Sequence, residues 1–185
     1  MGEQHKKHSR REHLNDFHLN VAGEYVYDGA LYACQSDDAK QRRSKRAVWG
    51  MAAILTVAVA AGGCIPAPGM QNCFYVLLPY LGEFLGAASV IWALAKLGMD
   101  WGTVREYNYK KSVAVLPVRT AVTAVFSLLG IVCELIFFFV NDHAGQTFFA
   151  LLYVLLKLTA LLSALVLRAE IMQAEWDKLP KKDNS

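Results

Sequence analysis

The sequence predicts an all-α membrane protein, an antiparallel bundle of four transmembrane helices with both termini in the cytoplasm. Two observations carry this prediction. Of the 185 residues, 55% are hydrophobic, and they are concentrated in four windows. Outside the windows, Lys and Arg occur only at the two ends of the chain and in one of the three connections between the windows. Because roughly 20 residues of apolar helix cross a hydrocarbon core, each window has the length of a membrane span.

The four windows cover residues 47–65, 74–97, 118–140 and 147–167. They lack the alternation of polar and apolar residues that marks the strands of a membrane β-barrel. In lipid a backbone must satisfy its own hydrogen bonds, so continuous apolar runs of this length predict helices. The chain therefore divides into an N-terminal tail (1–46), a transmembrane domain (47–167) and a C-terminal tail (168–185).

The distribution of basic residues predicts the orientation. The connections at 65–72 and 141–146 contain no Lys or Arg, whereas both tails and the connection at 98–116 contain several. The positive-inside rule then places both tails in the cytoplasm of a cell-membrane protein. A removable signal peptide is not expected, because some 46 mostly polar residues precede the first apolar window. We expect the formal charge of +3 to reflect this topology, and expect no nucleic-acid partner.

The N-terminal tail carries three features. Its histidines, His5, His8, His13 and His18, match no ligand spacing of a known metal site, so no metal is expected. The Asp28-Gly29 pair between β-prone residues predicts a hairpin over 24–33, with Tyr25 opposite Tyr32, although a loosely structured tail is an equal alternative. A basic run at 40–46 predicts an anchor on anionic lipid; it consists of Lys40, Arg42, Arg43, Lys45 and Arg46.

Two cysteines, Cys64 and Cys73, flank the first extracytoplasmic connection. A disulfide between them would tie the outer ends of the first two helices together, in a compartment that permits disulfides. Redox catalysis is the alternative, but catalytic pairs usually have the C-x-x-C spacing, which these cysteines lack. The spacing therefore favours a structural disulfide.

One face of the third span carries small and polar residues at helical spacing: Thr120, Thr123, Ser127, Gly130 and Glu134. Such residues commonly form a packing seam between transmembrane helices. The alternative is one wall of a polar cavity that leads from the cytoplasm to Glu134. The seam is favoured, since Thr and Ser are frequent at helix contacts in membranes.

Three charged residues fall inside the spans, away from the ends of the windows: Glu83, Glu134 and Lys157. An unpaired lysine at mid-membrane costs at least about 3 kcal/mol, so Lys157 is expected to have an acidic partner. The short connection at 141–146 makes the last two spans antiparallel neighbours, which predicts a contact between Glu134 and Lys157. Glu83 is expected at nearly the depth of Lys157. We expect the three groups to form either an ion, proton or polar-substrate site, or a buried ion pair that fixes helix register or docks onto a second protein.

The sequence contains no P-loop, zinc signature or nucleophile elbow, so no cofactor is expected and an enzyme is disfavoured. The favoured hypothesis is an accessory or scaffold subunit that forms homo- or hetero-oligomers. A small transporter or channel subunit that uses the three charged residues is the first alternative. A membrane thiol oxidoreductase that uses the two extracytoplasmic cysteines is the second.

Overall fold

The computed structural model describes residues 17–19, 23, 25–27, 29–98, 102–141 and 147–179. Four long helices dominate it: α2 (Asp38–Cys64), α4 (Phe74–Leu97), α6 (Leu116–Val140) and α7 (Thr147–Gln173). Each contains a stretch long and apolar enough to cross a membrane. The prediction of four such helices is therefore confirmed.

Three of the helices extend beyond their apolar windows, α6 by two residues and α2 and α7 by more. Helix α2 begins at Asp38, within the basic run, and α7 continues to Gln173. The windows mark only the part of each helix that lipid would surround. Lys, Arg, Gln and Glu are good helix formers, so the helical backbone continues where the sequence becomes charged. The second window, 74–97, coincides with α4.

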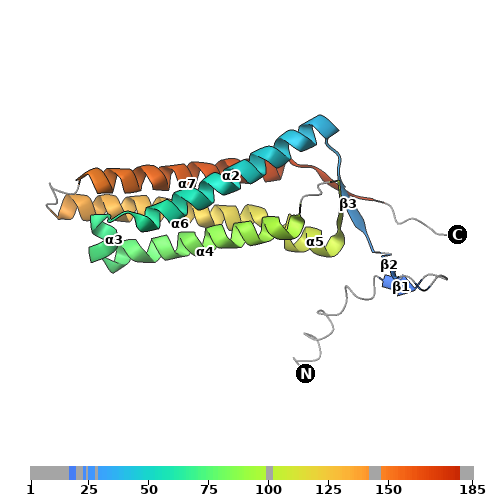
Figure 1. Cartoon of the computed structure of the whole chain (residues 1–185), viewed down its shortest axis with the longest axis horizontal. Coiled ribbons are helices and arrows are strands. Elements are labelled where there is room, and N and C mark those ends of the chain that lie inside the picture. The colour runs from blue at the N-terminus through green and yellow to red at the C-terminus, as the bar shows by residue number, and fades with distance from the viewer. Residues whose placement is uncertain are drawn as a thin grey trace, which may run out of the picture.

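The helices form an elongated bundle in which consecutive long helices run in opposite directions (Figure 1). Helix α6 packs extensively against both α4 and α7, and α7 also packs against α2. The contact between α2 and α4 is smaller. The order around the bundle is therefore α2, α7, α6, α4, and the predicted neighbourhood of the last two spans is confirmed.

The bundle is closed at one end by a short helix, α3 (Pro68–Asn72), which lies between α2 and α4 and contacts α6 and α7. At the opposite end, near the label β3 in Figure 1, a three-stranded sheet joins segments that are far apart in the sequence. We call these the α3 end and the sheet end. Helix α2 begins at the sheet end and α7 finishes there.

The sheet has the order β4-β3-β5, with β3 (Leu31–Cys34) in the centre. Strand β4 (Thr103–Arg105) and strand β5 (Trp176–Lys178) both pair with it in antiparallel fashion. Tyr32 is opposite Val104 on one side and Lys178 on the other. The sheet thereby joins the segment before α2, the connection between α4 and α6, and the segment after α7.

An aromatic cluster attaches this sheet to the helices. Helix α5 (Glu106–Lys111) follows β4 directly. Its Tyr109 stacks on Tyr32 of β3 with ring centroids 4.2 Å apart and the rings nearly parallel, and Trp176 of β5 lies 6.0 Å from Tyr109. Both Tyr109 and Trp176 also pack on the buried apolar residues at this end of the bundle. The sheet is therefore continuous with the bundle core.

The hairpin predicted over 24–33 is wrong. Strand β2 (Tyr25–Tyr27) pairs with β1 (Phe17–Leu19), so that Tyr25 lies opposite Leu19 instead of Tyr32. Strand β3 pairs with β4 and β5. A local turn signal cannot report strands that arrive from elsewhere in the chain, and two partners on β3 satisfy more backbone groups than one hairpin partner would. Asp28 itself is outside the described residues.

Candidate functional site

The polar face of α6 points into the bundle. All five residues predicted to share that face are buried: Thr120, Thr123, Ser127, Gly130 and Glu134. Thr123 Oγ1 donates a hydrogen bond to the carbonyl of Arg119 at 2.9 Å, and Thr120 Oγ1 donates likewise to the carbonyl of Leu116 at 3.0 Å. These hydroxyls are satisfied within their own helix, as is usual for Thr in transmembrane helices.

At the middle of the bundle Lys157 of α7 forms an ion pair with Glu83 of α4. The exposed fraction of Glu83 is 0% and that of Lys157 is 1%, so neither charge has contact with the exterior. Ser127 of α6 completes the group, because its Oγ donates to Glu83 Oε1 at 2.7 Å. Three helices therefore contribute one polar side chain each to a single cluster.

Two tyrosine rings border the ammonium group of Lys157. Its Nζ lies 4.5 Å from the ring centroid of Tyr80 and 5.0 Å from that of Tyr153. Aromatic faces attract cations, and the attraction is larger where water is excluded. The electron-rich rings thus add to the carboxylate in stabilising the buried cation. We refer to Glu83, Lys157, Ser127, Tyr80 and Tyr153 as the ion-pair cluster.

Small residues make room for this cluster. A Cβ atom at Gly130 would lie 3.6 Å from Lys157 Cε, so the aliphatic part of the lysine lies directly on the α6 backbone at that position. Glycines let helices approach closely in lipid, where packing contributes much of the association free energy. The predicted packing seam is thus the surface against which the charged side chain lies.

Glu134 is not the partner of Lys157. It is buried, with an exposed fraction of 1%, and its Oε1 accepts a hydrogen bond from the backbone N–H of Gly69 at 3.4 Å. Gly69 belongs to α3, so Glu134 connects α6 to the helix that closes the α3 end. The predicted contact between Glu134 and Lys157 is therefore replaced by the contact between Glu83 and Lys157.

Depth explains this difference. Counted at 1.5 Å per residue from the α3 end, Glu83 and Lys157 both lie about 15 Å deep, whereas Glu134 lies about 10 Å deep. Adjacency in the sequence suggested α6 as the partner helix of α7, although the matching depth already pointed to α4. The position of Glu134 depends on helix α3. No helix was predicted there, because the connection is rich in Pro and Gly.

The predicted disulfide between Cys64 and Cys73 is not formed. Both cysteines are free thiols, as are Cys34 and Cys133. Cys64 closes α2, Cys73 precedes α4, and helix α3 occupies most of the chain between them. The connection folds as a helix packed on α6 and α7 instead of the tight turn that a short disulfide loop would need.

Sequence reasoning missed the aromatic members of the cluster and one further polar contact. Tyr153 precedes Lys157 by four residues and Tyr80 precedes Glu83 by three, which are the spacings of helix-face neighbours and were a usable signal. Near the sheet end Arg119 Nη1 donates to the backbone carbonyl of Ser89 at 2.6 Å, connecting α6 to α4. The signal for this contact in the sequence was an arginine in the first turn of an otherwise apolar helix.

A buried carboxylate, amine and hydroxyl in contact join three helices, and of the five cluster residues only Tyr80 is partly exposed. Within the described part of the chain, no three His, Cys, Asp or Glu side chains are placed to hold a metal ion. Fold and cluster define a class: a small helical bundle of membrane-spanning length with an internal ion pair. Comparison with protein-family models, curated proteins and solved structures finds no match for the chain.

Proposed function

We propose that this chain is an accessory or scaffold subunit of a larger membrane assembly and that it offers the sheet at its sheet end to a partner. The observation that carries the proposal is the joining of β3, β4 and β5, which come from three separate parts of the chain, in one sheet anchored to the bundle core. A protein that only had to cross the membrane would not need such a sheet.

The outer strands of this sheet suit strand addition by a partner. Among the strands that the structure describes, β3 pairs on both of its sides, whereas β4 and β5 each pair on one side. On β4, Thr103 and Arg105 are exposed, and on β5, Asp177 and Lys178 are exposed. An edge strand offers unpaired backbone groups to another chain, and charged side chains along it limit indiscriminate pairing. The edges therefore favour a specific partner over self-aggregation.

The ion-pair cluster supports a structural role for the bundle. Transport through the bundle would need a polar group that can exchange with water, whereas Glu83 and Lys157 are buried and bonded to each other. Their pairing fixes the register of α4 against α7, which is one established use of buried polar groups. A rigid bundle that carries an accessible sheet fits a subunit that organises other chains, either copies of itself or different proteins.

The partner-binding proposal is tested by photocrosslinking in cells. A photoreactive phenylalanine analogue at Asp177 on β5 or at Thr103 on β4 is expected to yield an adduct with a defined second protein or a second copy. The same analogue at Leu155, an exposed apolar position on α7, serves as the matched control. Defined adducts at neither edge position would contradict the proposal.

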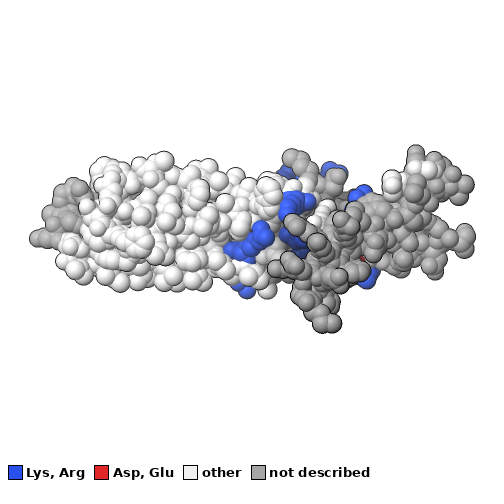
Figure 2. Space-filling model, turned by 90° about the horizontal axis from the view of Figure 1, so that it is seen from below, with Lys and Arg blue, Asp and Glu red and all other residues white. Residues whose placement is uncertain are grey.

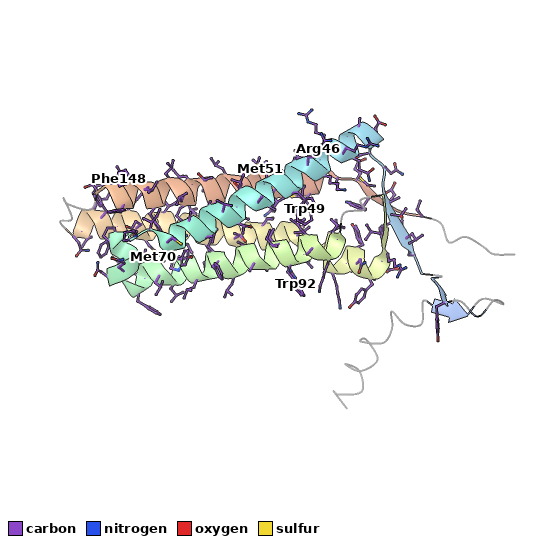
Figure 3. The ribbon with its side chains drawn as sticks, viewed as in Figure 1. Arg46, Trp49, Met51, Met70, Trp92 and Phe148 are labelled. Atoms are coloured by element: carbon purple, nitrogen blue, oxygen red, sulfur yellow. The ribbon has the colours of Figure 1, made fainter. Side chains whose placement is uncertain are left out.

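We further propose that the chain lies in the cell membrane with the sheet end in the cytoplasm. The support is the distribution of basic residues. On the face shown in Figure 2, Lys and Arg lie near the sheet end, and the long apolar part of the bundle shows no Lys or Arg. Trp92, on the outer side of α4, has Lys96 Nζ 5.2 Å from its ring, a pair typical of the membrane interface (Figure 3). Anionic lipid is then the expected contact of Lys40, Arg42, Arg43, Lys45 and Arg46.

Single-cysteine variants test this orientation. Cys64 lies at the α3 end and is exposed, so a membrane-impermeant maleimide should label it in intact cells. Cys34, in strand β3 at the sheet end, should react only after the cells are permeabilised. Labelling of Cys34 in intact cells, with Cys64 protected, would reverse the proposed topology.

A further inference from the structure

A groove between the beginning of α2 and the end of α7 has a volume of about 270 Å³. Its lining comes from β3, the turn that follows it, and both helices, and includes Cys34, Ser36, Lys40, Arg43, Glu170 and Gln173. An adjoining, more open hollow is lined by Ala39, Arg42, Arg43 and Arg46. Arg43 borders both.

The walls of the groove are fixed by direct contacts. Ser44 Oγ of α2 donates to Glu170 Oε2 of α7 at 3.1 Å, and the backbone N–H of Gln35 donates to the carbonyl of Glu175 at 3.1 Å. These bonds hold the start of α2 against the end of α7. The position of the groove walls is therefore set by the packing of the two helix ends as well as by the side chains that line the groove.

The residues that line the groove carry a net positive charge. Lys40 and Arg43, three residues apart on one helix face, stand against the single carboxylate of Glu170, which already accepts a hydrogen bond from Ser44. Arg42 and Arg46 add two positive charges in the adjoining hollow. Arginine presents a planar set of donors that matches phosphate oxygens, and lysine adds a mobile point charge.

The groove also lies at the level of lipid headgroups. The apolar part of α2 begins at Ala47, and Arg43 precedes it by four residues, or about 6 Å along the helix axis. Arg46, the residue directly before the apolar part, lies in the sheet-end part of α2 (Figure 3). In the proposed orientation this layer contains the phosphates of the cytoplasmic leaflet.

We propose that this groove is a binding site for a phosphate group, with Arg43 and Lys40 as the principal contacts and an anionic lipid of the cytoplasmic leaflet as its source. The inference rests on the proposed contact of the basic run with anionic lipid, which it narrows from a diffuse attraction to one site. It assigns different roles to neighbouring arginines: Arg43 lines the groove, whereas Arg46 lines only the open hollow. Glu170, the acid in the groove, should oppose binding.

The test is native mass spectrometry of the purified full-length chain titrated with dioctanoyl phosphatidic acid, dioctanoyl phosphatidylcholine or inorganic phosphate. Arg43→Gln is expected to weaken retention of phosphatidic acid about fivefold or more, the factor that corresponds to about 1 kcal/mol for one charge near the headgroups. Arg46→Gln, the matched control, should change it less than about twofold, because Arg46 does not line the groove and water and salt screen its charge. Glu170→Gln should increase retention, because it removes the negative charge from the groove. Because Arg43 is exposed, its substitution should leave thermal stability unchanged.

The outcomes separate the claims. Equal losses in Arg43→Gln and Arg46→Gln would overturn the groove while leaving the diffuse lipid contact standing. If neither variant loses retention of phosphatidic acid, both the groove and the diffuse lipid contact are overturned. Both are also overturned if the unaltered chain retains phosphatidylcholine as well as it retains phosphatidic acid. If phosphatidic acid is retained and inorganic phosphate does not displace it, the phosphate comes from lipid. If inorganic phosphate displaces it, the phosphate site stands and its occupant is the free ion.

Discussion

Lys157→Met is expected to lower the free energy of unfolding by about 3 to 5 kcal/mol, because it leaves the carboxylate of Glu83 buried without its cation. Methionine fills much of the volume of the lysine side chain, so the loss is mainly electrostatic. The measurement is unfolding of the detergent-solubilised protein by sodium dodecyl sulfate, with abundance in the membrane as a second readout.

A second substitution distinguishes this cause from damage to packing. Adding Glu83→Gln to Lys157→Met removes the stranded charge and should restore much of the stability and abundance. Adding Glu134→Gln should restore little, since Glu134 contacts Gly69 at the α3 end. Rescue by Glu134→Gln and not by Glu83→Gln would show that Lys157 pairs with Glu134, as the adjacency of the last two spans suggested.

Gly86→Ala is expected to destabilise the bundle by about 1 to 3 kcal/mol through overpacking. A Cβ atom at this position would lie 2.5 Å from Thr123 Oγ1 and 3.3 Å from Thr123 Cα. Rotating the threonine would break its bond to the carbonyl of Arg119, and its Cα cannot move unless α6 moves. Helices α4 and α6 would therefore have to separate, and the same unfolding titration measures the effect.

Gly50→Ala is the matched control for that substitution. Gly50 lies in α2, and a Cβ atom there would have no heavy atom within 4 Å. Alanine forms helix more readily than glycine by up to about 1 kcal/mol, so this variant should be neutral or more stable. Equal destabilisation by the two substitutions would show that the close approach of α4 to α6 does not determine stability.

Much of the bundle was predictable because its causes are local. An apolar window of about 20 residues has few alternatives to a membrane helix. The spacing of Thr120, Thr123, Ser127, Gly130 and Glu134 predicted one face of α6, and that face is buried. The need of Lys157 for an acidic partner followed from the cost of an unpaired charge in lipid. Such arguments use only residue type and helical periodicity.

The parts that were not predicted depend on segments distant in the sequence. The partner of Lys157 is on α4, 74 residues earlier, and Glu134 is placed by a backbone N–H of α3. Strand β3 finds its partners after α4 and after α7, so the nearby Asp-Gly turn signal was misleading. Matching of depths between helices would have selected Glu83, whereas no local pattern indicated the sheet.

In the proposed subunit the bundle and the sheet have different roles: the bundle holds the structure together and the sheet binds the partner. The ion-pair cluster, the Gly86–Thr123 contact and the Arg119–Ser89 bond fix the helices relative to one another. The stacked rings of Tyr32 and Tyr109 connect strand β3 of the sheet to helix α5. Variants that weaken the bundle should therefore also reduce crosslinking at the sheet edges, whereas edge variants should leave stability unchanged.

The most direct test of the account is a double-mutant cycle on Glu83→Gln and Lys157→Met, with the free energy of unfolding measured for all four proteins. The account predicts that the double variant loses less stability than the sum of the two single losses, by about 1 to 3 kcal/mol, as contacting charged residues do. Losses that add to within about 0.5 kcal/mol would show that the two side chains do not interact, and would contradict the account.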